Sequence, residues 1–228
     1  MHIRALHEWD VGVSRATEIQ QMLRPRVSLR DSTNLKRLRR IGGADVSYVQ
    51  DQETIYGGVV VLSFPDLEVV EKGWARGRVS FPYIPGLLSF REAPILLKAL
   101  SLLDQTPDVV IFDGQGIAHP RGLGLASHMG LVLDFPSVGC AKTRFVGEYR
   151  EVGRKRGSFS WLEFGGKRVG TVVRTRANVK PVFVSPGHRI SLRTATRLVL
   201  ATCRGYRLPE PIRLAHQLVN GLKRKQEE

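Results

Sequence analysis

The chain has 228 residues, of which 42% are hydrophobic and 25% are charged, a composition typical of a globular protein with a sizeable core. Its 35 Lys and Arg residues against 21 Asp and Glu residues give a net charge of +14, and a protein this basic usually binds a polyanion, nucleic acid being the first expectation. No run of about 18 apolar residues is present, which excludes a transmembrane helix of ordinary length.

The sequence shows no sign of secretion or of a membrane partner. The first ten residues lack the apolar region of a signal peptide, and no basic amphipathic helix with bulky apolar anchors is evident. Cys140 and Cys203 are too few for a disulfide framework or a zinc site. We therefore expect a cytoplasmic protein.

The N-terminal region predicts a helix followed by a basic segment. Over residues 13–23 apolar side chains recur at helical spacing, namely Val13, Ala16, Ile19 and Leu23. Residues 24–40 carry one acid, Asp31, against the basic residues Arg24, Arg26, Arg30, Lys36, Arg37, Arg39 and Arg40. This segment is either a solvated linker or a surface that faces phosphates.

From residue 41 the pattern becomes that of a mixed β-sheet. Three successive strands are predicted, at residues 41–49, 54–64 and 67–79. The turn at Pro65 and Asp66 favours an antiparallel meander. A helix is predicted at 89–105, and the continuously apolar run before Asp113, within 108–113, is typical of a central strand buried on both faces.

The remaining elements complete an α/β order. They are a helix at 122–134, a strand at 137–142, a hairpin of 158–164 and 167–176, a strand at 180–187, and helices at 191–205 and 210–223, with a frayed tail after them. No internal linker interrupts this order. We expect one domain spanning residues 1–228, with the helix and basic segment of about residues 1–40 packed on it. The sequence shows no spare apolar stripe, so we expect a monomer.

Three carboxylates stand out by their positions. Asp45 lies inside an apolar strand, where a carboxylate is costly unless it is paired or binds a metal, although it is also compatible with an early turn. Asp113 ends the central strand, beyond which ligand sites in open α/β sheets lie; helix capping or a turn is the alternative. Glu92 begins a helix and, with Ser89, also fits a capping box.

A lysine and a histidine complete the candidate cluster. Lys142 ends another apolar strand, and His216 lies in a predicted helix on the face that carries Ile212. Taken singly, His216 is more commonly explained as a core or boundary histidine, and Lys142 as an exposed cation at a strand end. Taken with the three carboxylates in a very basic chain, they indicate a hard-cation site for Mg²⁺ or Mn²⁺ that acts on a phosphate.

The stretch "VSFPYIPGLLSFRE" predicts a stiff loop. Pro82 and Pro85 fix the backbone on either side of Tyr83 and Ile84. Such a loop suits a wedge that inserts between stacked bases. The alternative is a surface loop that folds Tyr83 back onto the core.

These motifs together resemble the endonuclease V family, which acts on deaminated adenine (inosine) in nucleic acid. The matching stretches are "GGADVSY", "FPYIPGLLSFRE", "FDGQGIAHPRGLGLASHMG" and "VGCAKTRF". The resemblance runs in register from about residue 41 to 145 and more loosely to the end. It implies an RNase H-like fold, with a mixed five-stranded sheet whose first three strands are antiparallel and which is flanked by helices.

The resemblance also implies the chemistry and the residues that perform it. The activity is Mg²⁺-dependent hydrolysis of the second phosphodiester bond 3′ to deoxyinosine in DNA, leaving 3′-hydroxyl and 5′-phosphate ends. The catalytic positions are Asp45, Glu92, Asp113, Lys142 and His216, of which the three carboxylates bind the metal. The substrate positions are the wedge Pro82, Tyr83, Ile84 and Pro85, the base pocket Gly86, Leu88, Gly114 and Gly116, and the nearby His119 and Arg121.

Other functions remain compatible with the sequence. The same carboxylates would serve an endoribonuclease directed at inosine in RNA, or an RNase H-like nuclease specific for flaps or mismatches. Charge alone would suit a nucleic-acid-binding protein without catalytic activity, in which the carboxylates have structural roles. The sequence leaves open whether one metal ion or two are bound.

Overall fold

The computed structural model describes residues 2–32, 37–49 and 53–227. Eight strands form one mixed sheet in the order β3-β2-β1-β4-β5-β8-β7-β6. The strands are β1 (Arg40–Tyr48), β2 (Thr54–Ser63), β3 (Val69–Arg78), β4 (Val109–Phe112), β5 (Ser137–Ala141), β6 (Phe159–Phe164), β7 (Lys167–Val173) and β8 (Val182–His188). The α-helices are α1 (Val13–Leu23), α2 (Leu88–Ser101), α3 (Leu125–Leu133), α4 (Leu192–Ala201) and α5 (Glu210–Glu227).

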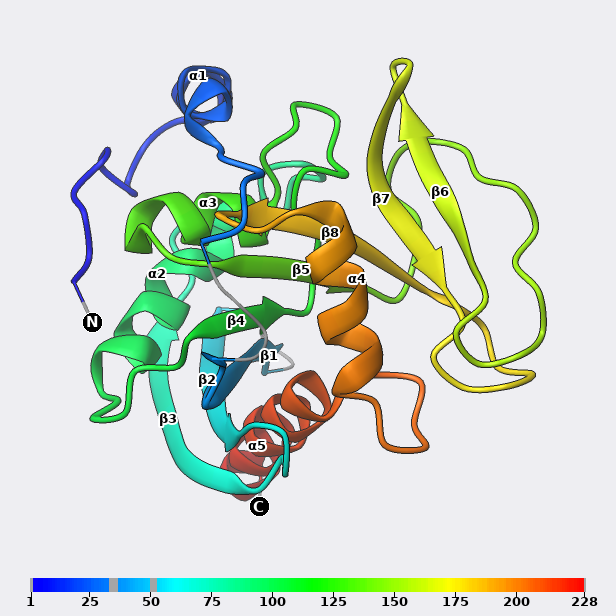
Figure 1. Cartoon of the computed structure of the whole chain (residues 1–228). Coiled ribbons are helices and arrows are strands. Elements are labelled where there is room, and N and C mark those ends of the chain that lie inside the picture. Colours follow the sequence, from blue (N-terminus) through cyan, green and yellow to red (C-terminus); the bar gives the residue numbers. More distant parts are fainter. Residues whose placement is uncertain (1, 33–36, 50–52, 228) are drawn as a thin grey trace.

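Helices cover both faces of the sheet, as Figure 1 shows. The helices α4 and α5 pack on one face through Leu198 and Ile212, in a cluster that includes Ile111 of β4. The helices α2 and α3 pack on the other face, in a cluster that includes Phe112. Alternate residues of β4 thus enter opposite clusters, which explains why this strand is apolar throughout and confirms its central, two-sided burial.

The predicted antiparallel arrangement of the first three strands is confirmed. The strand β2 pairs antiparallel with both β1 and β3, while β4 pairs parallel with β1. The expectation of five strands is too small. Because β8 pairs antiparallel with β5 and then with β7, the predicted hairpin β6–β7 continues the same sheet instead of standing apart.

Two local expectations at helix ends are wrong. The helix α2 begins at Leu88, so Ser89 lies inside it and does not cap it; Ser89 Oγ instead lies 2.9 Å from His128 Nδ1. Pro94 is accommodated within the helix. At the other end of the chain, α5 continues to Glu227 where a frayed tail was expected.

The N-terminal helix α1 forms as predicted and packs on the rest of the molecule through Ala16, Ile19 and Leu23. Part of the basic segment of residues 24–40 is held against the rest of the molecule by hydrogen bonds. Asp31 accepts hydrogen bonds from the backbone N–H and hydroxyl of Ser191, the residue that caps α4. Residues 33–36, which include Lys36, lie outside the described part of the chain.

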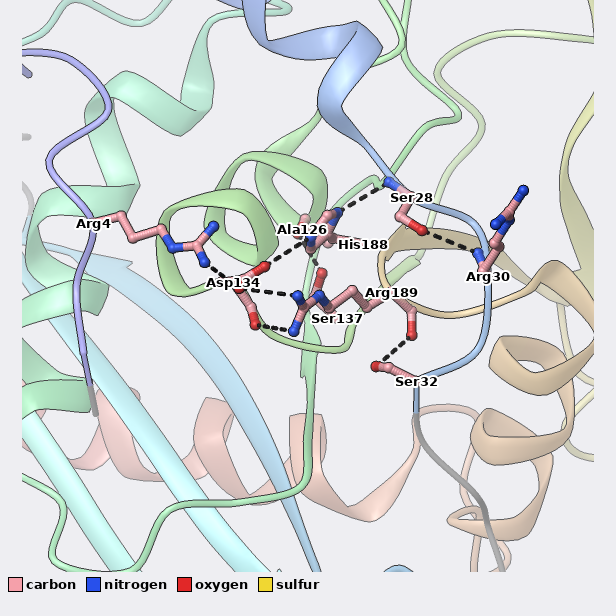
Figure 2. A network of polar contacts seen from close by, with 9 residues as sticks. All are labelled: Arg4, Ser28, Arg30, Ser32, Ala126, Asp134, Ser137, His188 and Arg189. Atoms are coloured by element: carbon pink, nitrogen blue, oxygen red, sulfur yellow. Dashed lines mark hydrogen bonds and ion pairs between the residues drawn. The ribbon is translucent and has the colours of Figure 1, made fainter.

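A polar network joins the N-terminal segment to the core, as Figure 2 shows. Asp134, directly after α3, forms ion pairs with Arg4 and with Arg189, the latter at 3.0 Å. His188 accepts a hydrogen bond from the backbone N–H of Ser28 at 3.1 Å through Nδ1. Residues far apart in sequence thereby hold both ends of the N-terminal segment. Within the described residues, no helix is both long and apolar enough to cross a membrane.

Candidate active site

Two neighbouring parallel strands place the two aspartates side by side. Asp45 lies on β1 and Asp113 directly follows β4, and the backbone N–H of Asp113 donates to the carbonyl of Ala44 at 3.1 Å. Asp45 is buried, and its Oδ1 accepts a hydrogen bond from the N–H of Val46 at 2.8 Å. The sheet therefore explains why an aspartate occurs within an apolar strand.

The helix α5, which packs against β1, places His216 next to Asp45. His216 Nδ1 lies 2.7 Å from Asp45 Oδ2, and because a carboxylate accepts, Nδ1 carries the proton. The side chain of His216 is half exposed, so its Nε2 is left for another partner. Gly43 makes this packing possible, since a Cβ there would lie 2.1 Å from the carbonyl carbon of Pro211 in the first turn of α5.

Lys142, which follows β5, contacts Asp113 through a short ion pair between Nζ and Oδ2. Burial alone would lower the pKa of Lys142, but the adjacent Asp113 carboxylate outweighs it and the pKa is raised. Lys142 is therefore a firmly charged ammonium at the edge of the carboxylate cluster.

Glu92 reaches the same region from α2. Burial, together with the charges of Asp45 and Asp113, raises the pKa of Glu92 to about 7, although the Tyr48 hydroxyl donates to Glu92 Oε1 at 3.1 Å and opposes this shift. Because this pKa is raised, keeping Glu92 ionised costs the folded chain free energy.

The raised pKa of Glu92 predicts how stability depends on pH in EDTA. The folded-state pKa, about 7, lies above the ordinary value of 4.5, so the folded chain binds the proton more tightly than the unfolded chain. Wild type should therefore lose stability relative to Glu92→Gln as pH rises from about 4.5 through 7, with no further change above. Thermal unfolding of both proteins across this range checks it, and parallel stability curves would contradict it.

The donor set fits a hard cation. Asp45, Asp113 and His216 each offer one ligand atom, and these atoms all lie within 4.8 Å of one another. Burial, and then the charge of Asp113, raises the pKa of Asp45 to about 6, as expected where carboxylates gather without enough positive charge. Two carboxylates with one imidazole suit an oxygen-preferring divalent ion. Glu92 lies outside this trio.

A cavity of about 440 Å³ adjoins the cluster. It shares Glu92, Asp113 and Lys142 with the cluster, and of the predicted substrate residues it is lined by Tyr83, Pro85, Gly86, Leu88, Gly114 and His119. Its volume falls in the range of about 300–1,000 Å³ typical of sites for small organic groups. The carboxylate cluster therefore lies next to a cavity that could hold one small organic group.

The Gly86 carbonyl is the centre of the loop that borders this cavity. His119 Nε2 lies 3.0 Å from it and Arg121 donates to it at 2.7 Å. Burial, then the charge of Arg121, lowers the pKa of His119 to about 4, so the ring is neutral near pH 7. Because Nδ1 accepts from the Arg121 backbone N–H, the proton lies on Nε2, which donates to Gly86.

The remaining predicted substrate residues lie around this loop. Tyr83 is 66% exposed, which rules out the alternative that it folds back onto the core. Pro82 is exposed as well, whereas Ile84 packs partly against the cluster under α1. Gly116 is not among the residues that line the cavity; its N–H donates to Ser185 Oγ at 2.7 Å and its carbonyl accepts from Gly124.

Two glutamines at the cavity were not anticipated from the sequence. Gln20 of α1 is 1% exposed, donates to the carbonyls of Gly86 and Leu123 at 2.9 and 3.1 Å, and accepts from Arg121. Gln115 Oε1 is buried and has no hydrogen-bond partner among the described residues. Gln20 lies in an amphipathic helix where a polar residue is unremarkable in sequence, so only the fold reveals its role.

A mixed α/β sheet with flanking helices, whose adjacent strands bring two aspartates and a lysine together beneath a histidine of a flanking helix, is the architecture of an RNase H-like nuclease. The family model for Endonuclease V matches residues 21–217. An Endonuclease V from Methanothrix thermoacetophila is 50% identical over 218 residues, covering 96% of this chain and 95% of its own. One from Dictyoglomus thermophilum is 52% identical over 206 residues, covering 90% and 89%.

Solved structures agree with these sequence matches. The Endonuclease V of Bacillus subtilis superposes with a TM-score of 0.95 at 30% identity, covering 100% of this chain and 99% of that one. The Endonuclease V of Ciona intestinalis, in complex with a 24mer DNA containing an inosine followed by a ribo-adenosine, gives a TM-score of 0.84 at 27% identity, covering 93% and 98%. This chain belongs to the endonuclease V family.

Proposed function

We propose that this protein is a DNA repair endonuclease that uses Mg²⁺, or Mn²⁺ in its place, to hydrolyse the second phosphodiester bond 3′ to deoxyinosine. The products are a 3′-hydroxyl and a 5′-phosphate. The observation that carries the proposal is the cavity that shares Asp113 and Glu92 with the carboxylate cluster. The relative from Ciona intestinalis bound to inosine-containing DNA supports the choice of substrate. Residues 1–228 act as one domain and as a monomer in this proposal.

Asp45 and Asp113 would hold the metal ion, with His216 beside them. Glu92, which lines the adjoining cavity, would lie at the border of the metal site. A divalent ion in such a site supplies charge stabilisation at the phosphate and activates water. Lys142 Nζ, already at Asp113, adds a fixed positive charge for a non-bridging phosphate oxygen. Since His216 Nδ1 donates to Asp45, its half-exposed Nε2 is the atom left to exchange a proton during hydrolysis.

The cavity would receive the extruded base while the loop replaces it in the stack. Tyr83 is exposed at the tip of the loop and has the flat apolar ring that a wedge requires. The loop is held from behind, because Gln20, His119 and Arg121 all bind the Gly86 carbonyl. A fixed loop lets binding energy be spent on opening the duplex instead of on ordering the protein.

We expect Gly114→Ala to weaken recognition of the base without changing the stability of the fold. A Cβ at Gly114 would make its nearest contact with Leu125 at 3.5 Å, an ordinary packing distance, so the fold should accept it. Because Gly114 lines the cavity, the methyl group should lower kcat/KM on an inosine duplex roughly tenfold to a hundredfold. Cleavage kinetics with thermal unfolding check this, and Gly12→Ala, where a Cβ meets nothing within 4 Å, is the control.

One gel tests the proposed function as a whole. The protein is incubated with Mg²⁺ and end-labelled duplexes that differ only in a single deoxyinosine, with EDTA controls. A single Mg²⁺-dependent nick directly 3′ of the nucleotide that follows the deoxyinosine is the expected result. Cleavage restricted to inosine in RNA, or to unmodified flaps, would replace the proposed substrate, and binding without cleavage of any substrate would overturn the proposal.

A further inference from the structure

A second and larger cavity lies beside the first, and nothing in the proposed cleavage reaction uses it. This groove has a volume of about 930 Å³ and is bordered by residues 144–150 and by the β6–β7 hairpin. Arg144 and Phe145 line both cavities, so the groove adjoins the proposed base pocket. The ring of Phe145 also lies 5.5 Å from that of His119, which borders the base pocket.

The groove presents aromatic rings on a framework held by backbone hydrogen bonds. Phe145, Tyr149, Trp161 and Phe164 all line it. Glu148 and Glu163 exchange N–H to carbonyl hydrogen bonds at 2.8 and 2.9 Å, which fixes the loop against β6. The hairpin turns at Gly165 and Gly166, both with positive φ, as a tight two-residue connection requires. The rings are therefore positioned in advance.

Arginines accompany the rings. Arg168 lies over Trp161 at 4.6 Å from its ring centroid, and Arg144 lies over Tyr149 at 6.0 Å. Arg150 also lines the groove, whose carboxylates are Glu148 and Glu163. The arginines outnumber the acids, and exposed aromatic rings among arginines are what proteins use to stack unpaired bases and to neutralise the strand that carries them.

We propose that this groove binds an unpaired stretch of the DNA strand that carries the lesion, continuing from the base pocket along the β6–β7 hairpin. A paired duplex hides the faces of its bases, so rings of this kind have a partner only where the strand is open. Because Arg144 and Phe145 border both the base pocket and the groove, the strand whose base enters the pocket is the one nearest the groove. This inference rests on the proposed function and adds to it the form of DNA that binds most tightly.

The test compares binding to two kinds of labelled DNA in EDTA. One is a paired duplex with a single deoxyinosine. The other kind comprises two probes with the same deoxyinosine: one has a tail of about ten unpaired nucleotides on the 5′ side of the inosine, and the other has such a tail on its 3′ side. Wild type should bind at least one tailed probe several-fold more tightly than the paired duplex. Phe164→Ala should weaken that tailed complex roughly fivefold or more and leave the paired one unchanged, since stacking contributes about 1–3 kcal/mol per base.

Matched variants exclude a general effect on folding or charge. Trp74 of β3 is an aromatic residue, 46% exposed, that does not border the groove, so Trp74→Ala should change neither complex. Phe164→Trp should retain the tight tailed complex. Equal losses in the two alanine variants, or tailed probes that bind no better than the paired duplex, would overturn the inference.

Two further measurements distinguish a failure of the groove assignment from a failure of the proposed function. Cleavage of the paired inosine duplex in Mg²⁺ tests the proposed function alone, and Phe164→Ala should preserve it. If cleavage proceeds while tails have no effect, only the groove assignment falls. Tails of ribonucleotides form a separate arm, and a loss in Phe164→Ala confined to them would overturn the choice of DNA.

Discussion

Asp45→Asn should reduce Mg²⁺-dependent cleavage of an inosine duplex by at least about a thousandfold, while DNA binding largely survives. Asp45 is the buried member of the candidate metal trio and is hydrogen-bonded to His216, and asparagine keeps its shape but removes its charge. Loss of a cation that stabilises several kcal/mol of transition-state charge corresponds to this factor, at about 1.36 kcal/mol per tenfold. Single-turnover cleavage together with a binding titration measures it.

A second readout ties the loss to the metal. Mg²⁺ should raise the unfolding temperature of wild type, because an ion that binds only the folded chain stabilises it, and should not raise that of Asp45→Asn. The variant in EDTA should be at least as stable as wild type at pH 8, since burial and Asp113 raise the pKa of Asp45. Cleavage at the wild-type rate by Asp45→Asn would refute the assignment.

Gly43→Ala should destabilise the fold by about 3 kcal/mol, which lowers the unfolding temperature by roughly 6–12 °C. Its Cβ would lie 2.1 Å from the backbone carbon and oxygen of Pro211, so α5 must shift away from β1. His216 moves with α5 while Asp45 stays on β1. Activity per folded molecule should therefore fall too, as thermal unfolding and cleavage assays on the same preparation would show.

Gly221→Ala is the matched control, placed on α5, the helix that Gly43→Ala is expected to displace. A Cβ at Gly221 meets nothing within 4 Å, so alanine should stabilise α5 by about 0.5–1 kcal/mol and leave cleavage unchanged. If Gly43→Ala unfolds at the wild-type temperature, the close approach of α5 to β1 does not constrain the protein as inferred here.

The order of helices and strands could be predicted because the local pattern determines it. The apolar run at Val109–Phe112 has one stable environment, the centre of a sheet, and the structure puts it there. The width of the sheet could not be predicted, since pairing of β8 with β5 depends on contacts between residues as distant as Cys140 and Val184. Local sequence does not specify such partners.

The same distinction applies to the candidate site. Asp45 and Asp113 stood out because carboxylates are costly in apolar strands, and the structure places them next to each other. At Glu92 two local patterns competed, and the helix start at Leu88 decided between them. Gln20 gave no sign in sequence, because its partners Gly86 and Leu123 come 66 and 103 residues later.

The anchoring of the N-terminal segment has a consequence for synthesis on the ribosome. This segment emerges before its partners, because Arg4 pairs with a residue 130 positions later and Ser28 with one 160 positions later. At about 5–20 residues per second, the partner of Ser28 follows it by roughly 8–32 s. The apolar face formed by Ala16, Ile19 and Leu23 packs with residues between Phe81 and Leu131, so this face of α1 is open to chaperones until those residues have emerged.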